Sequence, residues 1–297
     1  MHKLIKATAV IFLAASLAAC GAQGASLTSG KYKKAPKMAF GDYPKVDGST
    51  SHIPLALALM QEITGCTEAE AESVTAFTRT NPSHVALSVG EADILIAYEA
   101  SEPTKKDIDN YASFEIQPIG TDALVFLVNE DNPVQSITSD ELRGIYTGII
   151  TNWKHVGGSD QEIMAFQRNE RSGSQALMQK LVMGDIAMVE PSDDLVEVEM
   201  SRLINAIGSF DASANAIGFS VFYYANNMYE VPGVRLIAVD GIMPSNETIK
   251  SGEYPHTDGF FCVLPDNPTT NARKIADWLI SDEGQAFIME KGYVPVR

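Results

Sequence analysis

Apolar residues recur along the chain with two different periods, and segments with the two periods alternate. Where apolar residues recur every three or four positions, the spacing predicts helices. Where they form short runs rich in β-branched and aromatic residues, the runs predict strands. The predicted helices cover residues 52–64, 82–91, 104–112, 138–146, 173–183, 193–207, 244–251 and 269–291, and the predicted strands cover residues 93–98, 114–119, 123–129, 162–167, 216–224, 234–239 and 259–264. This alternation predicts an α/β fold with largely parallel sheets.

Two short segments predict that the chain crosses between two lobes. Residues 118–121 and 254–257 each place a proline and small or polar residues directly before an apolar strand, which is typical of a turn or hinge. If both are hinges, lobe 1 consists of residues 38–119 plus 256–297, and lobe 2 consists of residues 120–255. We therefore expect a two-lobed fold in which each lobe is a mixed, mostly parallel sheet flanked by helices, with two hinge strands joining the lobes.

The first 19 residues have the pattern of a signal peptide. Lys3 and Lys6 precede an apolar run over residues 7–17, which holds only about half of the ~20 residues that a membrane-spanning helix needs. The following Leu17-Ala18-Ala19-Cys20 resembles the bacterial lipobox, although an ordinary cleavage site beside a chance cysteine is the alternative. The resemblance implies a lipidated Cys20, a polar tether over residues 20–37, and a protein anchored to the outer face of the cell membrane.

The charge of the chain excludes one large class of partner. The chain has 22 basic and 38 acidic residues, and loss of the signal peptide removes Lys3 and Lys6 but no acid. A surface this acidic argues against nucleic acid. A small anion remains compatible, because backbone N–H groups and one arginine can hold it locally.

Cysteine and histidine spacing predicts neither a metal site nor a cofactor site. No C-x-x-C or H-x-x-x-H pattern occurs in the sequence. Cys66 and Cys262 could form a disulfide in an exported protein. Two separate thiols, one of them buried in an apolar strand, fit the sequence equally well.

A first candidate binding cluster precedes the first long helix. Asp47-Gly48-Ser49-Thr50-Ser51 places glycine and hydroxyl residues directly before an apolar helical segment. Free N–H groups at a helix start, together with hydroxyl donors, suit an anion. Helix capping by Ser or Thr is the alternative interpretation.

A second cluster combines an arginine with a helix start. Arg168 ends a predicted strand, and Ser172-Gly173-Ser174 opens the next helix. A guanidinium can donate two hydrogen bonds to one oxyanion, and glycine lets the backbone approach a ligand closely. The alternative is a solvent-exposed arginine beside an ordinary helix cap.

A third candidate is Asp93, at the beginning of an apolar strand. A carboxylate can accept the proton of hydrogen phosphate, whereas sulfate carries no such proton and would be rejected. Asp93 therefore predicts discrimination between these two anions. A structural acid at the strand end is the alternative.

These clusters, together with Thr80, resemble the phosphate-binding proteins of ABC importers in the type II periplasmic-binding-protein superfamily. The similarity extends over residues 45–297. Residues 142–153, which end in Thr151-Asn152-Trp153, are similar to a helix-turn signature of that family. Residues 215–219, 277–279, 283–285 and 292–295 match further family segments in the same order along the chain.

The resemblance implies a ligand site, a partner and a task. The implied ligand-binding residues are Thr50, Ser51, Thr80, Asp93, Arg168, Ser172, Gly173 and Ser174. The implied task is to bind inorganic phosphate and deliver it to an ABC importer permease, and we expect a monomer without a cofactor. The chain departs from the family at Arg79-Thr80, where a Gly-Ser or Gly-Thr pair is common, and the counterpart of Ser101 is unclear.

Other functions fit parts of the same pattern. The cleft could hold molybdate, tungstate or a small organic acid, or the protein could be a ligand sensor. A hydrolase would use Ser172 or Ser174 as its nucleophile, but the sequence has no G-x-S-x-G elbow and its histidines are scattered. We therefore expect a binding protein and no enzyme. We assign Tyr98 and Tyr224 to packing.

Overall fold

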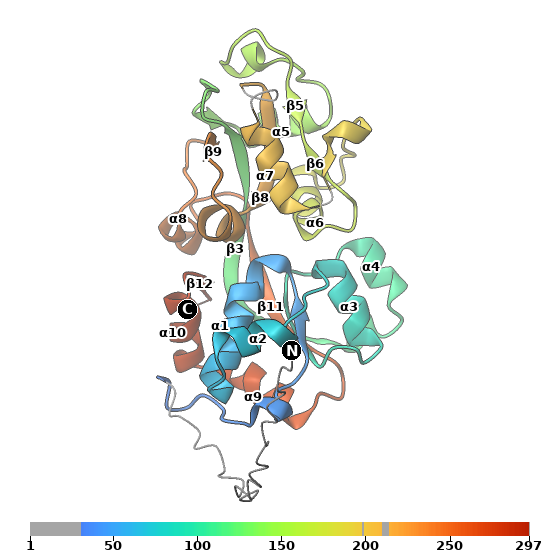
Figure 1. The fold of residues 1–297 in the computed structure, drawn as a ribbon. Helices are drawn as coiled ribbons and strands as arrows, with labels where there is room; N and C mark the ends of the chain where they lie inside the picture. Colours follow the sequence, from blue (N-terminus) through green and yellow to red (C-terminus); the bar gives the residue numbers. More distant parts are fainter. Residues whose placement is uncertain (1–30, 198, 210–213, 297) are drawn as a thin grey trace, which may run out of the picture.

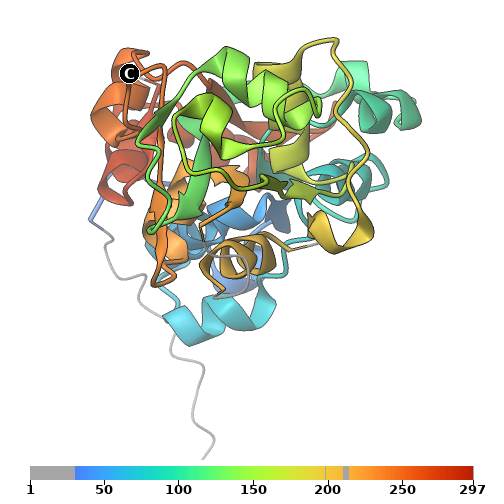
Figure 2. The ribbon, with the colours of Figure 1, turned by 90° about the horizontal axis from the view of Figure 1, so that it is seen from above.

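The computed structural model describes residues 31–197, 199–209 and 214–296, which form two stacked lobes (Figure 1). Seen from above, lobe 2 lies over lobe 1 (Figure 2). The predicted signal peptide and Cys20 lie outside the described residues. Within these described ranges, no helix is long and apolar enough to cross a membrane.

Lobe 1, the lower lobe in Figure 1, is built from both ends of the chain. Its strands are β1 (Val46–Gly48), β2 (Ile94–Ala97), β11 (Thr257–Leu264) and β12 (Val294–Pro295), and its helices are α1 (Ile53–Thr64), α2 (Glu68–Val74), α3 (Thr80–Ser88), α4 (Glu102–Asp107), α9 (Thr270–Leu279) and α10 (Asp282–Glu290). All four residues of β2 are buried, which explains its uninterrupted apolar sequence, since helices cover both faces of the sheet.

Lobe 2 is formed by the middle of the chain. Its short strands are β4 (Ser136–Ile137), β5 (Met164–Ala165), β6 (Gln167–Arg168), β7 (Val196–Glu197), β8 (Ala216–Val221), β9 (Val234–Leu236) and β10 (Ala238–Val239). Its helices are α5 (Ser139–Tyr146), α6 (Gly173–Met178), which continues into the π-helical turn η5 (Gln179–Met183), α7 (Met200–Gly208) and α8 (Asn246–Ser251). Thr138 caps α5 in a capping box with Glu141.

One long strand, β3 (Glu115–Asn129), joins the lobes. It pairs antiparallel with β11 up to Ala123 and with β8 from Leu124 onward. The sheet order is therefore β1-β2-β11-β3-β8-β5. The two-lobed α/β fold with mixed sheets is confirmed. Parallel pairing is limited to β1 with β2, β5 with β8, and two small ribbons, because the strands that run out of and back into lobe 1 pair antiparallel.

Several sequence-based boundaries differ from the structure, among them the predicted helix 193–207, in which β7 precedes α7. The predicted strands 114–119 and 123–129 are one strand, because Pro118 lies beside a β-bulge, at which Ile119 of β3 has no partner in β11. The predicted helix 269–291 is two helices, since Ser281 caps α10 and interrupts the helical hydrogen bonding. Residues 31–37, assigned to the tether, lie against lobe 1, where the Tyr32 ring contacts those of Trp278 and Phe287. The division into residues 38–119 plus 256–297 and residues 120–255 stays a prediction.

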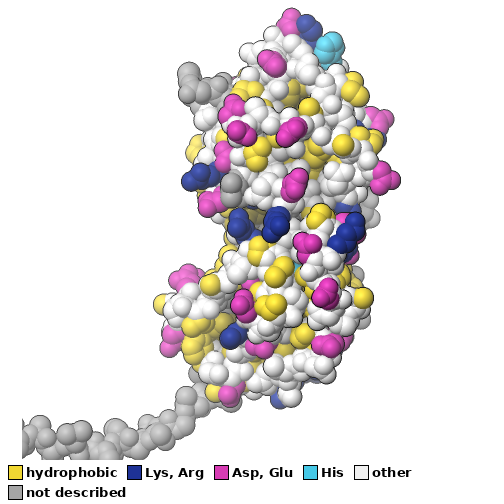
Figure 3. Space-filling model, turned by 90° about the vertical axis from the view of Figure 1, so that its right-hand side faces the viewer, with side chains coloured by type: hydrophobic (Ala, Val, Ile, Leu, Met, Phe, Trp, Pro, Cys, Tyr) yellow, Lys and Arg dark blue, Asp and Glu magenta, His cyan; other side chains and the backbone are white. Residues whose placement is uncertain are grey.

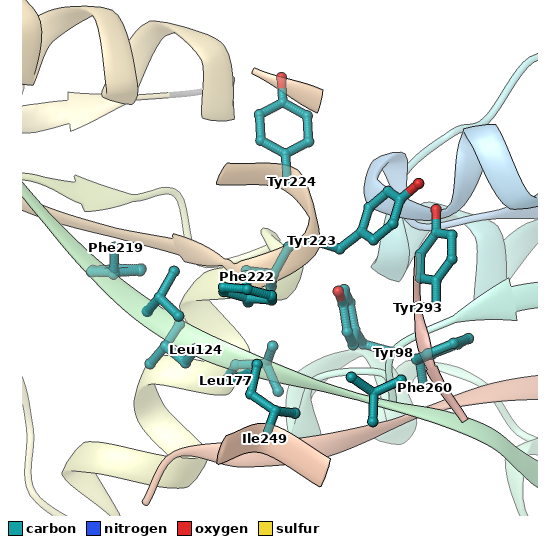
Figure 4. Close-up of a cluster of buried hydrophobic side chains, with 14 of the residues drawn as sticks. Tyr98, Leu124, Leu177, Phe219, Phe222, Tyr223, Tyr224, Ile249, Phe260 and Tyr293 are labelled. Atoms are coloured by element: carbon teal, nitrogen blue, oxygen red, sulfur yellow. The ribbon is translucent and has the colours of Figure 1, made fainter. Parts of the chain in front are cut away.

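A single large hydrophobic cluster runs through both lobes. Around the crossing strand it includes a group of aromatic side chains from both lobes (Figure 4). The rings of Tyr223, from lobe 2, and Tyr293, from lobe 1, stack with centroids 3.5 Å apart. The hydroxyl of Tyr223 also donates a hydrogen bond to the Lys291 carbonyl. Aromatic packing therefore fixes the lobes to each other on one side of the molecule.

Candidate functional site

A cleft of about 710 Å³ lies between the lobes, on the side of α3 and α6. Lobe 1 contributes residues at the carboxyl ends of β1 and β2 and at the start of α3, including Ser49, Thr50, Ser51, Arg79, Thr80 and Tyr98. Lobe 2 contributes residues after β6 and at the starts of α6 and α7, including Arg168, Arg171, Ser172, Gly173, Ser174 and Glu199. Ligands of α/β proteins bind at the carboxyl ends of strands, so this cleft is the candidate site.

A close backbone approach turns the chain into the cleft after β1. A Cβ atom at Gly48 would lie 1.9 Å from the Ile96 carbonyl oxygen, so only glycine fits there. The N–H of Ser49 donates to the same carbonyl at 3.1 Å. Residues 49–51 therefore leave the sheet directly above β2 and face lobe 2 at the start of α1.

One chain of hydrogen bonds prepares Thr80 as a donor. The Tyr98 N–H donates to Ser49 Oγ at 3.1 Å, and Ser49 Oγ lies 2.7 Å from Thr80 Oγ1. If the Ser49 hydroxyl donates to Thr80, the Thr80 proton can point into the cleft. All three residues are buried, and this arrangement suits an oxygen ligand.

A second chain starts at a buried acid in the crossing strand. Tyr98 Oη donates to Asp122 Oδ2 at 2.6 Å and lies 3.0 Å from Ser51 Oγ. Asp122 also accepts the N–H groups of Ala123 and Tyr223. Burial raises the pKa of Asp122 to about 6, although these donors act in the opposite direction. Since Tyr98 uses its proton toward Asp122, its oxygen is left to accept the hydroxyl of Ser51.

Arg168 is a buried cation in the cleft wall. The residue is only 7 % exposed, and its Nε donates to the Glu197 carbonyl at 2.9 Å. Its backbone N–H donates to the Gln175 side chain. Burial, and after it the charge of Arg79, lowers the pKa of Arg168 to about 10, so the guanidinium stays charged at neutral pH. A fixed buried cation of this kind favours an anionic ligand.

The start of α6 brings lobe 2 into contact with lobe 1. Ser172 Oγ accepts the N–H of Gln175 and lies 3.0 Å from Ser174 Oγ. A Cβ atom at Gly173 would lie 2.3 Å from Thr80 Oγ1, so the two lobes touch at this glycine. The structure is therefore closed over the cleft.

Arg79 has a backbone conformation that is unusual for an arginine. It precedes α3 with φ 82° and ψ 166°, a region that is essentially restricted to glycine and costs of order 1–3 kcal/mol for other residues. Glycine, which is common at this position in the family that the sequence resembles, would adopt this conformation without strain. A strained arginine at the edge of a cleft points to a role for its side chain.

Seven of the eight predicted site residues meet in the cleft. They are Thr50, Ser51, Thr80, Arg168, Ser172, Gly173 and Ser174. Their contacts with a ligand stay predictions. The structure thus brings together, from both lobes, the first cluster, the second cluster and Thr80.

Asp93 does not belong to this group, and its predicted role as the ligand-proton acceptor is wrong. It precedes β2 at the amino end, where its Oδ2 accepts the Lys45 N–H at 2.8 Å. The parallel pairing of β1 with β2 puts the cleft at the other end of both strands. A carboxylate before a strand cannot reach a ligand bound after it.

Asp93→Asn is expected to leave ligand binding unchanged. The carboxylate lies outside the cleft, so affinity should stay within about twofold of wild type, as for most surface substitutions. Titration calorimetry with phosphate and with sulfate checks this. A clear gain of sulfate binding in this variant would restore the original assignment.

Sequence reasoning missed several residues of the cleft. Tyr98 and Tyr224 were assigned to packing, yet both line it, and Tyr98 follows β2 at the carboxyl end, which was the usable signal. His52, beside the first cluster, is fully buried against Phe260 and Tyr98. Burial lowers its pKa to about 3, so it is neutral and does not line the cleft.

The two thiols are separate. Cys66 is partly buried, Cys262 is buried, and both are free. The disulfide alternative is therefore wrong in this structure. Among the described residues, no group of three or more His, Cys, Asp or Glu side chains is arranged to hold a metal ion.

Comparison with known families gives one match over most of the chain. The model of the PBP superfamily domain matches residues 39–283. Among curated proteins, the phosphate-binding protein PstS of Bacillus subtilis (strain 168) is 28% identical over 285 residues, covering 94% of this chain and 89% of that protein. PstS of Borreliella burgdorferi is 26% identical and covers 68% of this chain.

Solved structures agree in fold. A substrate-binding protein with bound phosphate from Clostridium perfringens has a TM-score of 0.66 at 22% identity, covering 86% of this chain and 100% of that chain. An ABC-type phosphate transport receptor from Vibrio cholerae has a TM-score of 0.63 at 23% identity, with the same coverage. At these identities the likeness concerns the fold alone.

Proposed function

Because the chain belongs to the PBP superfamily and has its type II two-lobed fold, we propose that it captures inorganic phosphate and delivers it to an ABC importer. The observation that carries the proposal is the cleft, in which Arg168 and hydroxyl groups from both lobes converge. The PstS relatives are named as phosphate-binding proteins. Binding of phosphate agrees with the chemistry of this cleft.

The donors around the cleft suit a tetrahedral oxyanion. Arg168 supplies a buried positive charge, and the hydroxyls of Thr80, Ser172 and Ser174 supply neutral donors. Hydrogen bonds to a charged group contribute about 1.5–3 kcal/mol each. Several together offset the loss of hydration of the anion and the ordering of the lobes. Local donors thus allow an acidic protein to hold an anion.

In this proposal Asp122 replaces Asp93 as the acid that recognises the phosphate proton. Asp122 accepts a hydrogen bond from the Tyr98 hydroxyl, and the Tyr98 oxygen accepts one from Ser51. Ser51 Oγ then turns a lone pair toward the cleft. Hydrogen phosphate can donate to this lone pair, whereas sulfate would bring two acceptors together.

Tyr98→Phe is expected to weaken phosphate binding about tenfold, because it removes one of the three donors to the buried Asp122 and leaves Ser51 without an acceptor. Sulfate binding should not weaken, so the preference for phosphate narrows. Calorimetry with both anions measures the ratio of the dissociation constants for sulfate and phosphate. Tyr254→Phe is the matched control, since Tyr254 donates to the Leu124 carbonyl outside the cleft. An unchanged ratio in Tyr98→Phe would remove the hydrogen-bond chain from the proposal.

Closure of the lobes is supported by contacts at the waist. Lys180 of lobe 2 forms ion pairs with Glu99 at 3.2 Å and with Asp258 at 2.8 Å, both on the lobe 1 side. The Asn81 side chain donates to the Arg171 carbonyl across the cleft. Since ligand-driven closure needs contacts that exist only in the closed state, these groups supply part of them.

The location of the protein follows from the leader segment. Cys20 would carry a lipid and hold the protein at the outer face of the cell membrane, with the permease as its partner and the protein itself as a monomer. The intact mass of the membrane-extracted protein tests this, because a mature chain beginning at residue 20 with an attached diacylglycerol is expected. A mature chain that begins at another residue and carries no lipid would contradict the proposed lipid anchor and leave the proposed ligand unaffected.

Catalysis by the serines of the cleft has little support. Within the described residues, the side chains of Ser172 and Ser174 bond to each other, and Ser172 also bonds to Gln175. In the part of the chain that the structure describes, no hydrogen bond joins a histidine or carboxylate to either hydroxyl, and a serine nucleophile requires such a partner. A binding protein therefore fits this cleft better than a hydrolase.

Calorimetry on the soluble domain with phosphate, sulfate and molybdate tests the proposed ligand. Phosphate is expected to bind in a one-to-one complex and the other two anions far more weakly. Preferential binding of molybdate or sulfate would reassign the ligand. Absence of binding by all three would overturn oxyanion capture.

A further inference from the structure

The mouth of the cleft carries two arginines that the binding of a single phosphate does not require. Arg79 comes from lobe 1 and Arg171 from lobe 2, both are exposed, and both line the cleft. Basic side chains gather at the waist between the lobes, whereas acidic ones are spread over both lobes (Figure 3). In a chain with a net charge of −16, this concentration of positive charge is local.

Within the described ranges, Arg79 and Arg171 take part in no ion pair. Glu199, the acid at this mouth, lies instead 4.0 Å from Arg202. The Asn81 side chain, two residues from Arg79, donates to the Arg171 carbonyl at 3.0 Å. Lobe closure therefore brings the backbones of these two segments together, and two like charges then line one cleft, which is unfavourable unless an anion binds there.

The backbone of Arg79 indicates that its side chain has a function. Its dihedral angles, φ 82° and ψ 166°, fall in a region that glycine adopts freely. An arginine in such a strained position at a binding cleft is typical of a functional residue. Glycine would adopt this backbone conformation without strain. The presence of an arginine therefore points to a role of its guanidinium in binding.

The volume of the cleft also exceeds the need of one phosphate. Clefts of 300–1,000 Å³ typically hold molecules of drug size, and this one measures about 710 Å³. The buried groups, Arg168, Thr80 and Ser51, line its inner part. Arg79 and Arg171 are exposed at the outer part, beyond these groups.

We propose that the cleft also takes diphosphate, with one phosphoryl group at Arg168 and the second between Arg79 and Arg171. This inference rests on the proposed phosphate site and extends it to linked phosphoryl groups. Arg79 is then the residue that determines specificity, because it adds a donor where glycine would leave the mouth open. Arg171 completes this outer subsite only when the lobes are closed.

Calorimetry with phosphate and with diphosphate, in metal-free buffer, tests the inference on wild type, Arg79→Gly and Arg79→Lys. Wild type should bind diphosphate at least as tightly as phosphate. Arg79→Gly should weaken diphosphate binding at least about tenfold and phosphate binding less than about threefold. Arg79→Lys, which keeps the charge, should fall between the two. Arg171→Ala should likewise weaken diphosphate binding more than phosphate binding.

Thermal unfolding separates a lost contact from a lost fold. Arg79→Gly relieves the backbone strain, so the melting temperature of the ligand-free protein should stay equal or rise. Failure of diphosphate to bind, with phosphate binding intact, would overturn the outer subsite alone. If Arg79→Gly weakened phosphate and diphosphate binding equally, Arg79 would only attract anions in general. That result would also overturn the outer subsite. Loss of phosphate binding by wild type would overturn the proposed function instead.

Discussion

Replacing Arg168 with alanine is expected to weaken phosphate binding by about 100- to 1000-fold, since truncating one partner of a buried charge pair costs 2–5 kcal/mol. Arg168 is the buried cation of the cleft, and Nε already holds the Glu197 carbonyl. Its guanidinium is therefore positioned before the ligand arrives, and no other buried cation lines the cleft among the described residues. Titration calorimetry at fixed ionic strength measures the loss.

Arg273→Ala is the matched control for this variant. Arg273 forms a two-pronged ion pair with Glu115 in lobe 1, outside the cleft. Its loss should leave phosphate affinity unchanged and lower stability by at most about 1 kcal/mol, as for exposed ion pairs. Phosphate binding by Arg168→Ala at wild-type strength, in a folded protein, would place the anion elsewhere.

Gly173→Ala is expected to weaken phosphate binding about 10- to 100-fold by preventing full closure, because overpacking typically costs 1–3 kcal/mol. The added methyl would lie 2.3 Å from Thr80 Oγ1, and Thr80 is buried and hydrogen-bonded to Ser49. Within lobe 2 alone the substitution is mild, since alanine favours a helix more than glycine does. Small-angle scattering with and without phosphate should show a larger ligand-bound radius of gyration than in wild type.

The control for added bulk is Gly41→Ala. A Cβ atom at Gly41 meets nothing within 4 Å, so binding and closure should match wild type. If Gly173→Ala bound phosphate as tightly as wild type and closed to the same radius, contact between Gly173 and Thr80 would have no part in the clamp.

The sequence predicted the cleft well where local chemistry determines position. Ser172 and Gly173 start a helix directly after a strand, and a strand-to-helix turn of an α/β fold lies at the ligand-binding edge. The same rule, applied to both ends of β2, excludes Asp93 from the site and favours Tyr98. Asp93 precedes the strand and Tyr98 follows it, so the tyrosine and not the aspartate is at the cleft.

Other features depend on contacts that no local pattern contains. The link from Tyr98 to Asp122 joins positions 24 residues apart on two strands that are separated in the sheet by β11. The continuity of β3 was missed because proline and glycine at 118 and 120 are typical of a turn. In the fold, a β-bulge at Ile119 of β3 accommodates Pro118, and the absence of a side chain at Gly120 makes room for the Phe260 ring. Tertiary packing therefore overrides the local preference.

The position of β11 determines when the protein can finish folding. This strand lies between β2 and β3 in the sheet, yet residues 257–264 are among the last to leave the ribosome. Until these residues are available, β2 and β3 have no strand between them to join the sheet. A chain truncated before residue 257 would therefore lack the strand that joins β1 and β2 to the rest of the sheet.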